Sequence, residues 1–240
     1  MASDDLDAAI RRADPDRWAA SRFVADAGAR ADLIALYAFN HELARATEAA
    51  HEPLVQEIRL TWWREALEEV FAGRPARRHP VVDAMAEAVR RRGLPQAPLE
   101  AMIEARIAAI AAPRLADEAA IYQHVDATAG ALMGLAATAL DSTVAPGSTQ
   151  AAARAWGLSG LARLRRAGAD RLPSAWTEAD VAVRVRATLV EAREAMRELP
   201  VAAFPAVAYA TLAAPYAAGR IPSELEKRLR LTAAVLTGRI

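Results

Sequence analysis

The sequence predicts an all-α protein, a single-domain, multi-helix bundle that spans residues 1–240. Two patterns carry this prediction. Apolar residues recur at three- and four-residue steps, as on one face of a helix, while sustained alternation of period two, the pattern of a strand, is missing from the sequence. Clusters of glycine and proline separate the periodic segments. With 54% hydrophobic residues, a chain of this length can bury a substantial core without dividing into domains.

The clearest periodicity predicts a long helix over residues 28–49. Its expected inward residues are Leu33, Leu36, Tyr37, Asn40, Leu43, Ala44 and Thr47. A second helix is expected over 53–71, because Gly73 and then Pro75 provide a stop signal. Its expected inward residues are Leu54, Ile58, Trp62, Leu67 and Val70.

Further helices are expected between the later glycine and proline clusters, over residues 79–92, 99–111, 116–140, 149–166, 178–199, 205–217 and 223–236. Segment 128–140 is so rich in glycine and alanine that a neighbouring helix could approach its backbone closely. This segment is therefore expected to be the central, wholly buried helix of the bundle.

Charge and composition exclude several classes of function. The chain carries 30 basic and 30 acidic residues, so no overall field attracts it to nucleic acid. It contains no cysteine, which excludes disulfides, thiolate metal sites and a cysteine nucleophile. The first residues are acidic where a secretory signal requires a basic region, which predicts a cytoplasmic protein.

One charge-free run, residues 199–219, approaches the length of a membrane span. Pro200, Pro205 and Pro215 interrupt it, and much of its apolar content is alanine. These features favour a buried core helix, with contact at a membrane surface as the alternative.

The residues alone indicate no known chemistry. His41 and Glu42 begin like the HExxH zinc signature, but Arg45 stands where the second histidine is required, so a zinc site is rejected. Asp4, Asp5 and Asp7 cluster at the N-terminus, where capping of a helix is expected, and the other aspartates are scattered and form no pair at helical spacing. Neither a glycine-rich phosphate loop nor a GxSxG motif occurs in the sequence.

A resemblance to a known family implies a fold type and a function, which the residue pattern alone does not indicate. The segment Arg30-Ala-Asp-Leu-Ile-Ala-Leu-Tyr-Ala-Phe-Asn-His-Glu-Leu-Ala-Arg-Ala-Thr-Glu resembles the squalene/phytoene synthase family, in which an arginine precedes a "YAF" helix that continues into an aspartate-rich motif. The likeness continues through Leu60-Thr-Trp-Trp-Arg-Glu-Ala-Leu, the turn from Gly73 to Val81, the small-residue segment 116–140 and the region 156–173. It implies the isoprenoid (terpenoid) synthase type of helical bundle.

In that family, two aspartate-rich motifs bind magnesium ions that hold and ionise prenyl diphosphates. In this chain the opening positions of the first motif fall on Ala44 and Arg45, which leaves Glu48 as its only acid. The stretch of the second motif, residues 164–173, keeps Asp170 as its only carboxylate. The departure predicts that neither magnesium nor another cofactor is held, and that magnesium-dependent condensation is lost or severely weakened.

The sequence is closer still to a non-catalytic branch of the family, the complex I assembly factor 6 type. The "AFN-x-ELA" pattern of that branch is met by Ala38-Phe-Asn-His-Glu-Leu-Ala, and its "PvkAFPA" pattern by Pro200-Val-Ala-Ala-Phe-Pro-Ala. This resemblance implies a factor that contacts respiratory complex I subunits, or one that keeps a cavity for an isoprenoid lipid such as a quinone tail.

Two alternatives remain open. A divergent prenyl-diphosphate transferase for head-to-head condensation could keep some magnesium or let arginines grip phosphate directly, whereas a plain interaction module would have no cavity. Arg165 and Arg166 are expected on a solvated face. The candidate pocket residues are Tyr37, Asn40, Arg45, Glu48, Tyr122, Arg163, Asp170 and Arg171.

Overall fold

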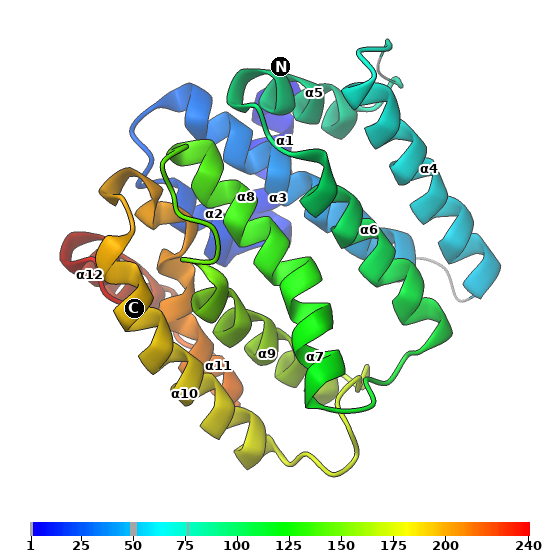
Figure 1. Ribbon diagram of the computed structural model, residues 1–240. Helices are drawn as coiled ribbons and strands as arrows, with labels where there is room; N and C mark the ends of the chain where they lie inside the picture. Colours follow the sequence, from blue (N-terminus) through cyan, green and yellow to red (C-terminus); the bar gives the residue numbers. More distant parts are fainter. Residues whose placement is uncertain (1, 49–51, 76) are drawn as a thin grey trace.

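Helices without strands make up the fold over residues 2–48, 52–75 and 77–240, the part of the chain that the computed structural model describes (Figure 1). The predicted all-α class is confirmed. The α-helices are α1 (Ala2–Ala13), α2 (Pro15–Ser21), α3 (Ala27–Glu48), α4 (Pro53–Phe71), α5 (Pro80–Arg92), α6 (Gln96–Ala111), α7 (Glu118–Val125), α8 (Ala131–Leu140), α9 (Gln150–Arg166), α10 (Glu178–Ala195), α11 (Ala213–Ala217) and α12 (Glu224–Thr237). Ala49, the predicted end of the first long helix, lies outside the described residues.

Helix α3 occupies the middle of the bundle and contacts α1, α2, α4, α5, α6 and α8. Because neighbours cover it on several sides, its buried residues include both the predicted Leu33, Leu36, Tyr37 and Leu43 and the unpredicted Ile34 and Phe39. Near its start, the buried Asp32 accepts hydrogen bonds from Arg91 at 2.7 Å and Arg92 at 2.6 Å. These two ion pairs fix α5 against α3.

Local capping explains why several helix ends were predictable. His79 caps α5 by accepting from the Val81 backbone N–H at 3.3 Å, and the helix ends at Gly93, whose φ of 62° is the left-handed conformation that glycine tolerates best. Thr177 and Asp180 form a reciprocal capping box at the start of α10. Ser223 caps α12, because its side chain accepts from the Glu226 backbone N–H.

The predicted helix over 116–140 is continuous but contains a π-helical turn, η1 (Asp126–Gly130), between α7 and α8. Inside this turn, the Thr128 hydroxyl donates to the His124 carbonyl at 2.7 Å. Helix α9 packs closely here, since a Cβ on Gly157 would lie 2.5 Å from a methyl group of Val125. The close approach therefore uses a glycine of the neighbouring helix.

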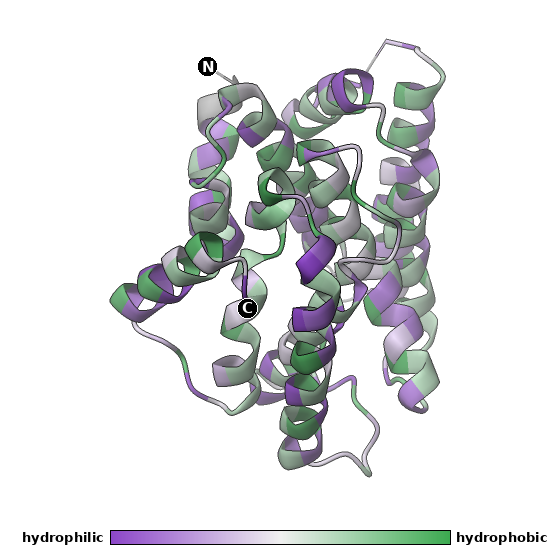
Figure 2. Cartoon of the chain, turned by 60° about the vertical axis from the view of Figure 1, so that its left-hand side comes forward, coloured by the Kyte–Doolittle hydropathy of each residue, from purple (hydrophilic) through white to green (hydrophobic). Residues whose placement is uncertain are grey.

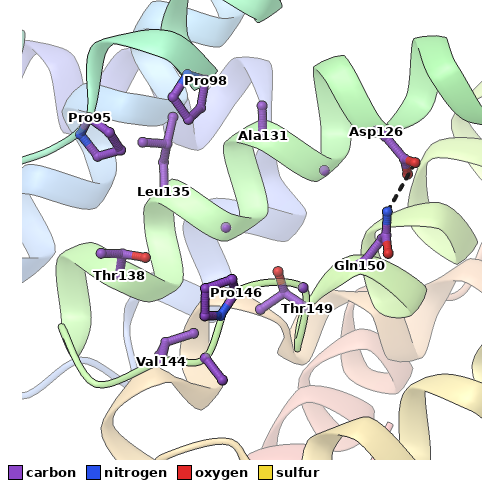
Figure 3. Close-up of a pocket in the computed structure, with 14 residues that line it drawn as sticks. Pro95, Pro98, Asp126, Ala131, Leu135, Thr138, Val144, Pro146, Thr149 and Gln150 are labelled. Atoms are coloured by element: carbon purple, nitrogen blue, oxygen red, sulfur yellow. Dashed lines mark hydrogen bonds between the residues drawn. The ribbon is translucent and has the colours of Figure 1, made fainter.

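The expectation that segment 128–140 is wholly buried is wrong on one side. Gly130, Gly134 and Thr138 line a surface pocket of about 380 Å³ that prolines and the loop after α8 enclose (Figure 3). Asp126 accepts from the Gln150 side chain at 3.1 Å at one end of it. The opposite face of α8, with Leu132, Met133 and Ala136, is buried as predicted.

The predicted α-helix over 205–217 is replaced by two 3₁₀ segments, η3 (Val201–Ala206) and η4 (Ala208–Leu212), followed by the short α11. Prolines 205 and 215 lack the N–H that a continuous α-helix needs, which explains the break. The burial of this run is confirmed, because most of residues 203–217 lie in the core. Helix α10 likewise ends at Ala195 and continues only as the 3₁₀ turn η2 (Met196–Glu198).

Two features of the N-terminal half were not predicted correctly or at all. The bounds of helices α1 and α2 were not predicted, although Asp7 ties them together by accepting from the Trp18 ring N–H at 3.0 Å. In α4, the predicted Leu67 is buried, and Trp62 and Val70 pack against the core. The predicted Leu54 and Ile58 are 66% and 59% exposed instead, and the unpredicted Leu60 and Trp63 are buried. None of the helices in the described ranges is both long and apolar enough to cross a membrane.

Candidate functional site

The residues that approach one another inside the bundle come from both halves of the chain. Helix α3 supplies Tyr37 and Asn40, α6 supplies Arg106, and α7 supplies His124. Arg17 enters from α2 and Arg171 from the loop after α9. We call these six residues the inner cluster.

The side chain of Arg106 is hydrogen-bonded both to α3 and to its own helix, α6. Its guanidinium donates to the Asn40 side-chain oxygen at 2.8 Å and to the Met102 carbonyl at 2.7 Å. Burial and the positive charges of Arg17 and Arg171 lower the pKa of Arg106 to about 10, against an opposing effect of Glu48. The cation is thus desolvated and surrounded by like charge, with neutral groups as its hydrogen-bond partners.

Arg171 is the second cation of the inner cluster. It donates from Nε to the Pro113 carbonyl at 3.2 Å, and within the described chain its buried Nη2 has no hydrogen-bond partner. Burial lowers the pKa of Arg171. Burial, followed by the charges of Arg171 and Arg106, also lowers the pKa of His124 to about 4, so this imidazole is neutral at pH 7.

His124 and Arg171 line a pocket of about 390 Å³ between α6 and α7, which we call the α6–α7 pocket. Most of its wall is alanine side chain, from Ala101, Ala105, Ala108, Ala109, Ala112, Ala120 and Ala127. Glu104, Leu115 and Gln123 also line it. A largely alanine wall that includes Arg171 is suited to a hydrophobic molecule that carries an anionic head.

Arg17 forms the other end of the inner cluster. Its guanidinium pairs with Asp14 at 2.6 Å and lies over the rings of Tyr37 and Tyr209, at 5.9 Å and 5.0 Å from their centroids. Burial acts to lower the pKa of Arg17, but Asp14 and Tyr209 together outweigh it, and the pKa is raised. The buried Tyr37 hydroxyl has no hydrogen-bond partner among the residues that the structure describes, and burial raises its pKa.

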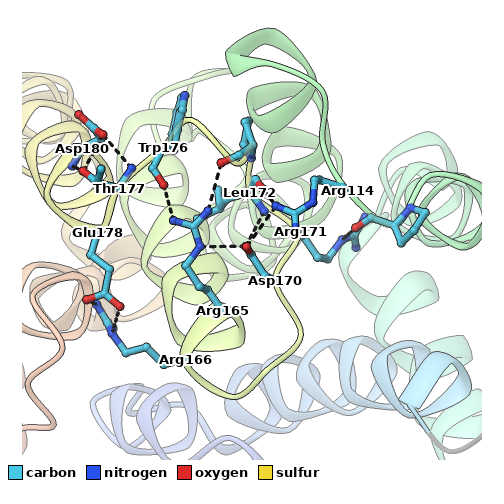
Figure 4. A network of polar contacts seen from close by, with 12 residues as sticks. Arg114, Arg165, Arg166, Asp170, Arg171, Leu172, Trp176, Thr177, Glu178 and Asp180 are labelled. Carbon is cyan, nitrogen blue, oxygen red and sulfur yellow. Dashed lines mark hydrogen bonds and ion pairs between the residues drawn. The ribbon is translucent and has the colours of Figure 1, made fainter.

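The segment after α9 is fixed by Arg165 (Figure 4). Its guanidinium donates to Asp170 at 2.9 Å, to the Trp176 carbonyl at 2.6 Å and to the Pro173 carbonyl at 3.2 Å. Arg114 adds a second ion pair to Asp170, at 3.2 Å. These contacts, led by the Arg165 hydrogen bond, lower the pKa of Asp170.

Arg166 is also structural, because it binds Glu178 through both of its carboxylate oxygens and the carbonyls of Tyr216 and Ala217. The expected solvated face is confirmed for Arg166, which is exposed, but not for Arg165, which is half-buried. Each guanidinium holds a loop or a helix end in place.

The remaining candidate residues lie outside the inner cluster. Arg45 is exposed and pairs with Glu42 at 2.8 Å, beside Trp62 and His79. Tyr122 packs under Arg154, whose guanidinium lies 4.8 Å from the ring centroid. Arg163 lies on the outer side of α9, over the rings of Trp156 and Tyr216. Glu48 is exposed at the end of α3, near enough to act on the pKa of Arg106.

Comparison with known proteins identifies the family to which this chain belongs. Residues 10–171 match the squalene/phytoene synthase family. The chain belongs to that family. No match is found among curated protein sequences.

Two solved structures share the isoprenoid synthase fold of this family. A dehydrosqualene synthase in complex with a ligand superposes with a TM-score of 0.78 at 13% sequence identity, over 98% of this chain and 95% of that one. The squalene synthase HpnC from Alicyclobacillus acidocaldarius gives a TM-score of 0.68 at 15% identity, over 98% and 94% of the two chains.

A squalene/phytoene synthase of the active type requires carboxylates from both motifs to coordinate magnesium. In this member Glu48 stands alone at the end of α3, and Asp170 is engaged by Arg165 and Arg114. In residues 2–48, 52–75 and 77–240, no three histidine or acidic side chains come together as metal ligands could. The side chains present therefore do not fit a magnesium–diphosphate site.

Sequence reasoning missed Arg17, Arg106, His124 and Tyr209. Arg106 offered one signal, since it is a lone charge in the run Ala105-Arg-Ile-Ala-Ala-Ile. Buried charges in apolar helices commonly serve a site, so this position could have been singled out. The approach of the other residues depends on contacts between distant parts of the chain.

Proposed function

We propose that this squalene/phytoene synthase family member is non-catalytic and binds an isoprenoid anion on arginine side chains in place of magnesium. The observation that carries the proposal is the pair Arg106 and Arg171. Their hydrogen-bond acceptors are carbonyl and amide oxygens, and among the described residues neither guanidinium contacts a carboxylate.

Charge balance supports an anionic ligand. Burying a guanidinium without a counter-charge costs free energy, as the lowered pKa values of Arg106 and Arg171 show. A phosphate group offsets this cost, since guanidinium groups bind phosphate oxygens through paired hydrogen bonds. The orphaned Nη2 of Arg171 provides one such donor.

The apolar part of the ligand is suited to the α6–α7 pocket. Its alanine wall offers little polar surface, and an isoprenoid chain is long, narrow and apolar. Binding through arginines alone supplies affinity but lacks the metal ions that stabilise a departing diphosphate, so turnover is not expected.

The test is to incubate the purified protein with farnesyl and geranylgeranyl diphosphates and magnesium, and to follow diphosphate release and lipid products. The proposal predicts binding without release. Turnover that Glu48→Ala abolishes would instead establish the divergent prenyl-diphosphate transferase.

The assembly-factor branch supplies the biological setting that we propose for this binding. The matches at residues 38–44 and 200–206 support a role in assembling respiratory complex I through protein contacts. The support is the sequence resemblance alone, and a fold by itself does not specify a partner. Affinity capture from cells that express complex I tests this role, and enrichment of complex I subunits over a denatured control is the expected result.

A further inference from the structure

Helix α12 presents an apolar ridge on the outside of the bundle. Leu225, Leu229 and Leu236 are 68%, 63% and 79% exposed. Their spacing of four and seven residues places them on one stripe, opposite the buried Leu231 and Ala234. Figure 2 shows this helix, the last before the C-terminus, projecting at the left-hand edge of the molecule.

The segment that contains this ridge is basic, although Lys227 lies away from the ridge and pairs with Asp16 at 3.2 Å and Glu224 at 3.0 Å. Residues 220–240 contain five basic and two acidic side chains, namely Arg220, Lys227, Arg228, Arg230 and Arg239 against Glu224 and Glu226. Glu226 is shared by Arg220 and Arg230, so one acid serves two cations. Arg228, which flanks the ridge, pairs with no acidic group in the described part of the chain.

A second feature adjoins the start of α12. A pocket of about 610 Å³ lies between α2, α9, α11 and the loop before α12, and its rim includes Ile221, which is 81% exposed. Its lining holds five basic side chains and two acidic ones, Arg17, Arg163, Arg166, Arg220 and Lys227 against Asp14 and Asp16.

Arg163 is the cation of this pocket that is left without an acid. Its guanidinium lies 4.9 Å from the Trp156 ring centroid and 4.6 Å from that of Tyr216, and over the described residues it forms no ion pair. Stacking on two rings fixes the plane of the guanidinium and leaves its N–H groups for an anion at the pocket mouth.

We propose that α12 docks on an anionic phospholipid surface, with its leucine ridge among the acyl chains and a lipid phosphate at Arg163. Exposed leucines with basic flanks are the pattern of a helix that lies in a membrane interface. An exposed ridge on a peripheral helix fits the flat surface of a bilayer. Arg228 and Arg163, which form no ion pair among the described residues, match its negative charge. The inference is independent of what the α6–α7 pocket binds.

Vesicle sedimentation with the 240-residue chain tests this proposal. The wild type is expected to sediment with vesicles of equal parts phosphatidylcholine and phosphatidylglycerol, and far less with phosphatidylcholine alone or at high salt. Leu225→Ser/Leu229→Ser should weaken the binding about tenfold or more. Arg163→Gln should weaken it about fivefold.

Leu54→Ser/Ile58→Ser is the matched control, because this pair on α4 has the same four-residue spacing and similar exposure, 66% and 59%. Its vesicle binding should equal that of the wild type, and thermal unfolding should confirm that all variants fold. Failure of the wild type to bind, or an equal loss in the control, would overturn the proposal. The proposal would also be overturned by a third result. In that result, light scattering shows that the wild type is a dimer and that Leu225→Ser/Leu229→Ser is a monomer, while this variant still binds vesicles.

Discussion

Arg106 of α6 and Asn40 of α3 are joined by a 2.8 Å hydrogen bond between residues 66 positions apart in the sequence. The acceptor is a neutral amide. An amide satisfies one donor of the guanidinium and leaves its charge uncompensated, whereas a carboxylate would neutralise it. This pairing keeps the inner cluster cationic.

Replacing Asn40 by aspartate tests the importance of that neutrality. Asn40→Asp should form an internal ion pair with Arg106, raise the thermal midpoint and weaken the binding of farnesyl diphosphate about tenfold or more. Calorimetric titration in parallel with thermal unfolding measures both effects. Unchanged affinity in a folded Asn40→Asp variant would show that the Arg106 charge does not serve the ligand.

His124 should make the protein less stable in mild acid. Its pKa is about 4 in the fold and near 6.5 in the unfolded chain, so between these values the unfolded state binds the extra proton. The free energy of unfolding should therefore fall as the pH drops from 6.5 towards 4, by at most about 1.4 kcal/mol per pH unit from this residue.

The matched variant for this pH effect is His124→Gln, which cannot take up the proton. Urea unfolding of both proteins at several pH values should give curves that agree above pH 6.5 and diverge below it, with the wild type losing more. If the wild type and His124→Gln lost equal stability below pH 6.5, the pKa of His124 would be the same in the fold as in the unfolded chain.

Gly157 should tolerate no larger residue while Val125 is present. A Cβ there would lie 2.5 Å from one Val125 methyl group and 3.1 Å from the other, so Gly157→Ala should cost about 1–3 kcal/mol. Val125→Ala in the same chain should recover part of the loss. A double-mutant cycle by urea unfolding measures the coupling, and strict additivity would contradict the close packing of α9 on α7.

Arg165 should govern the order of the segment after α9. Removing its three acceptor contacts in Arg165→Ala should increase amide hydrogen exchange over residues 167–176 and lower stability by about 1–3 kcal/mol. Arg165→Lys should not rescue it, because one ammonium group cannot reach the same acceptors. The exposed Arg186 provides the control, and similar exchange in Arg186→Ala would argue against a specific role.

The sequence was informative where the structural cause is local. Helix ends at Gly93 and Ser223 follow from capping and glycine conformation, which depend on a few adjacent residues. In α4, two apolar stripes compete, and periodicity alone could not tell that Leu60 and Trp63 face the core while Leu54 and Ile58 face out.

The candidate site was only partly predictable for a physical reason. Tyr37 and Asn40 could be placed because they follow the family pattern along one helix. Arg17, Arg106 and His124 converge from α2, α6 and α7, and their approach depends on how these helices pack. The family pattern indicated the missing carboxylates, but it did not reveal the arginines inside the bundle.

Calorimetric titration of the wild type with farnesyl diphosphate, once in EDTA and once in excess magnesium, tests the central claim most directly. If Arg106 and Arg171 supply the charge that metal ions supply in active enzymes, the protein binds the diphosphate in EDTA with an affinity that magnesium does not increase. Binding that appears only when magnesium is added would contradict this account.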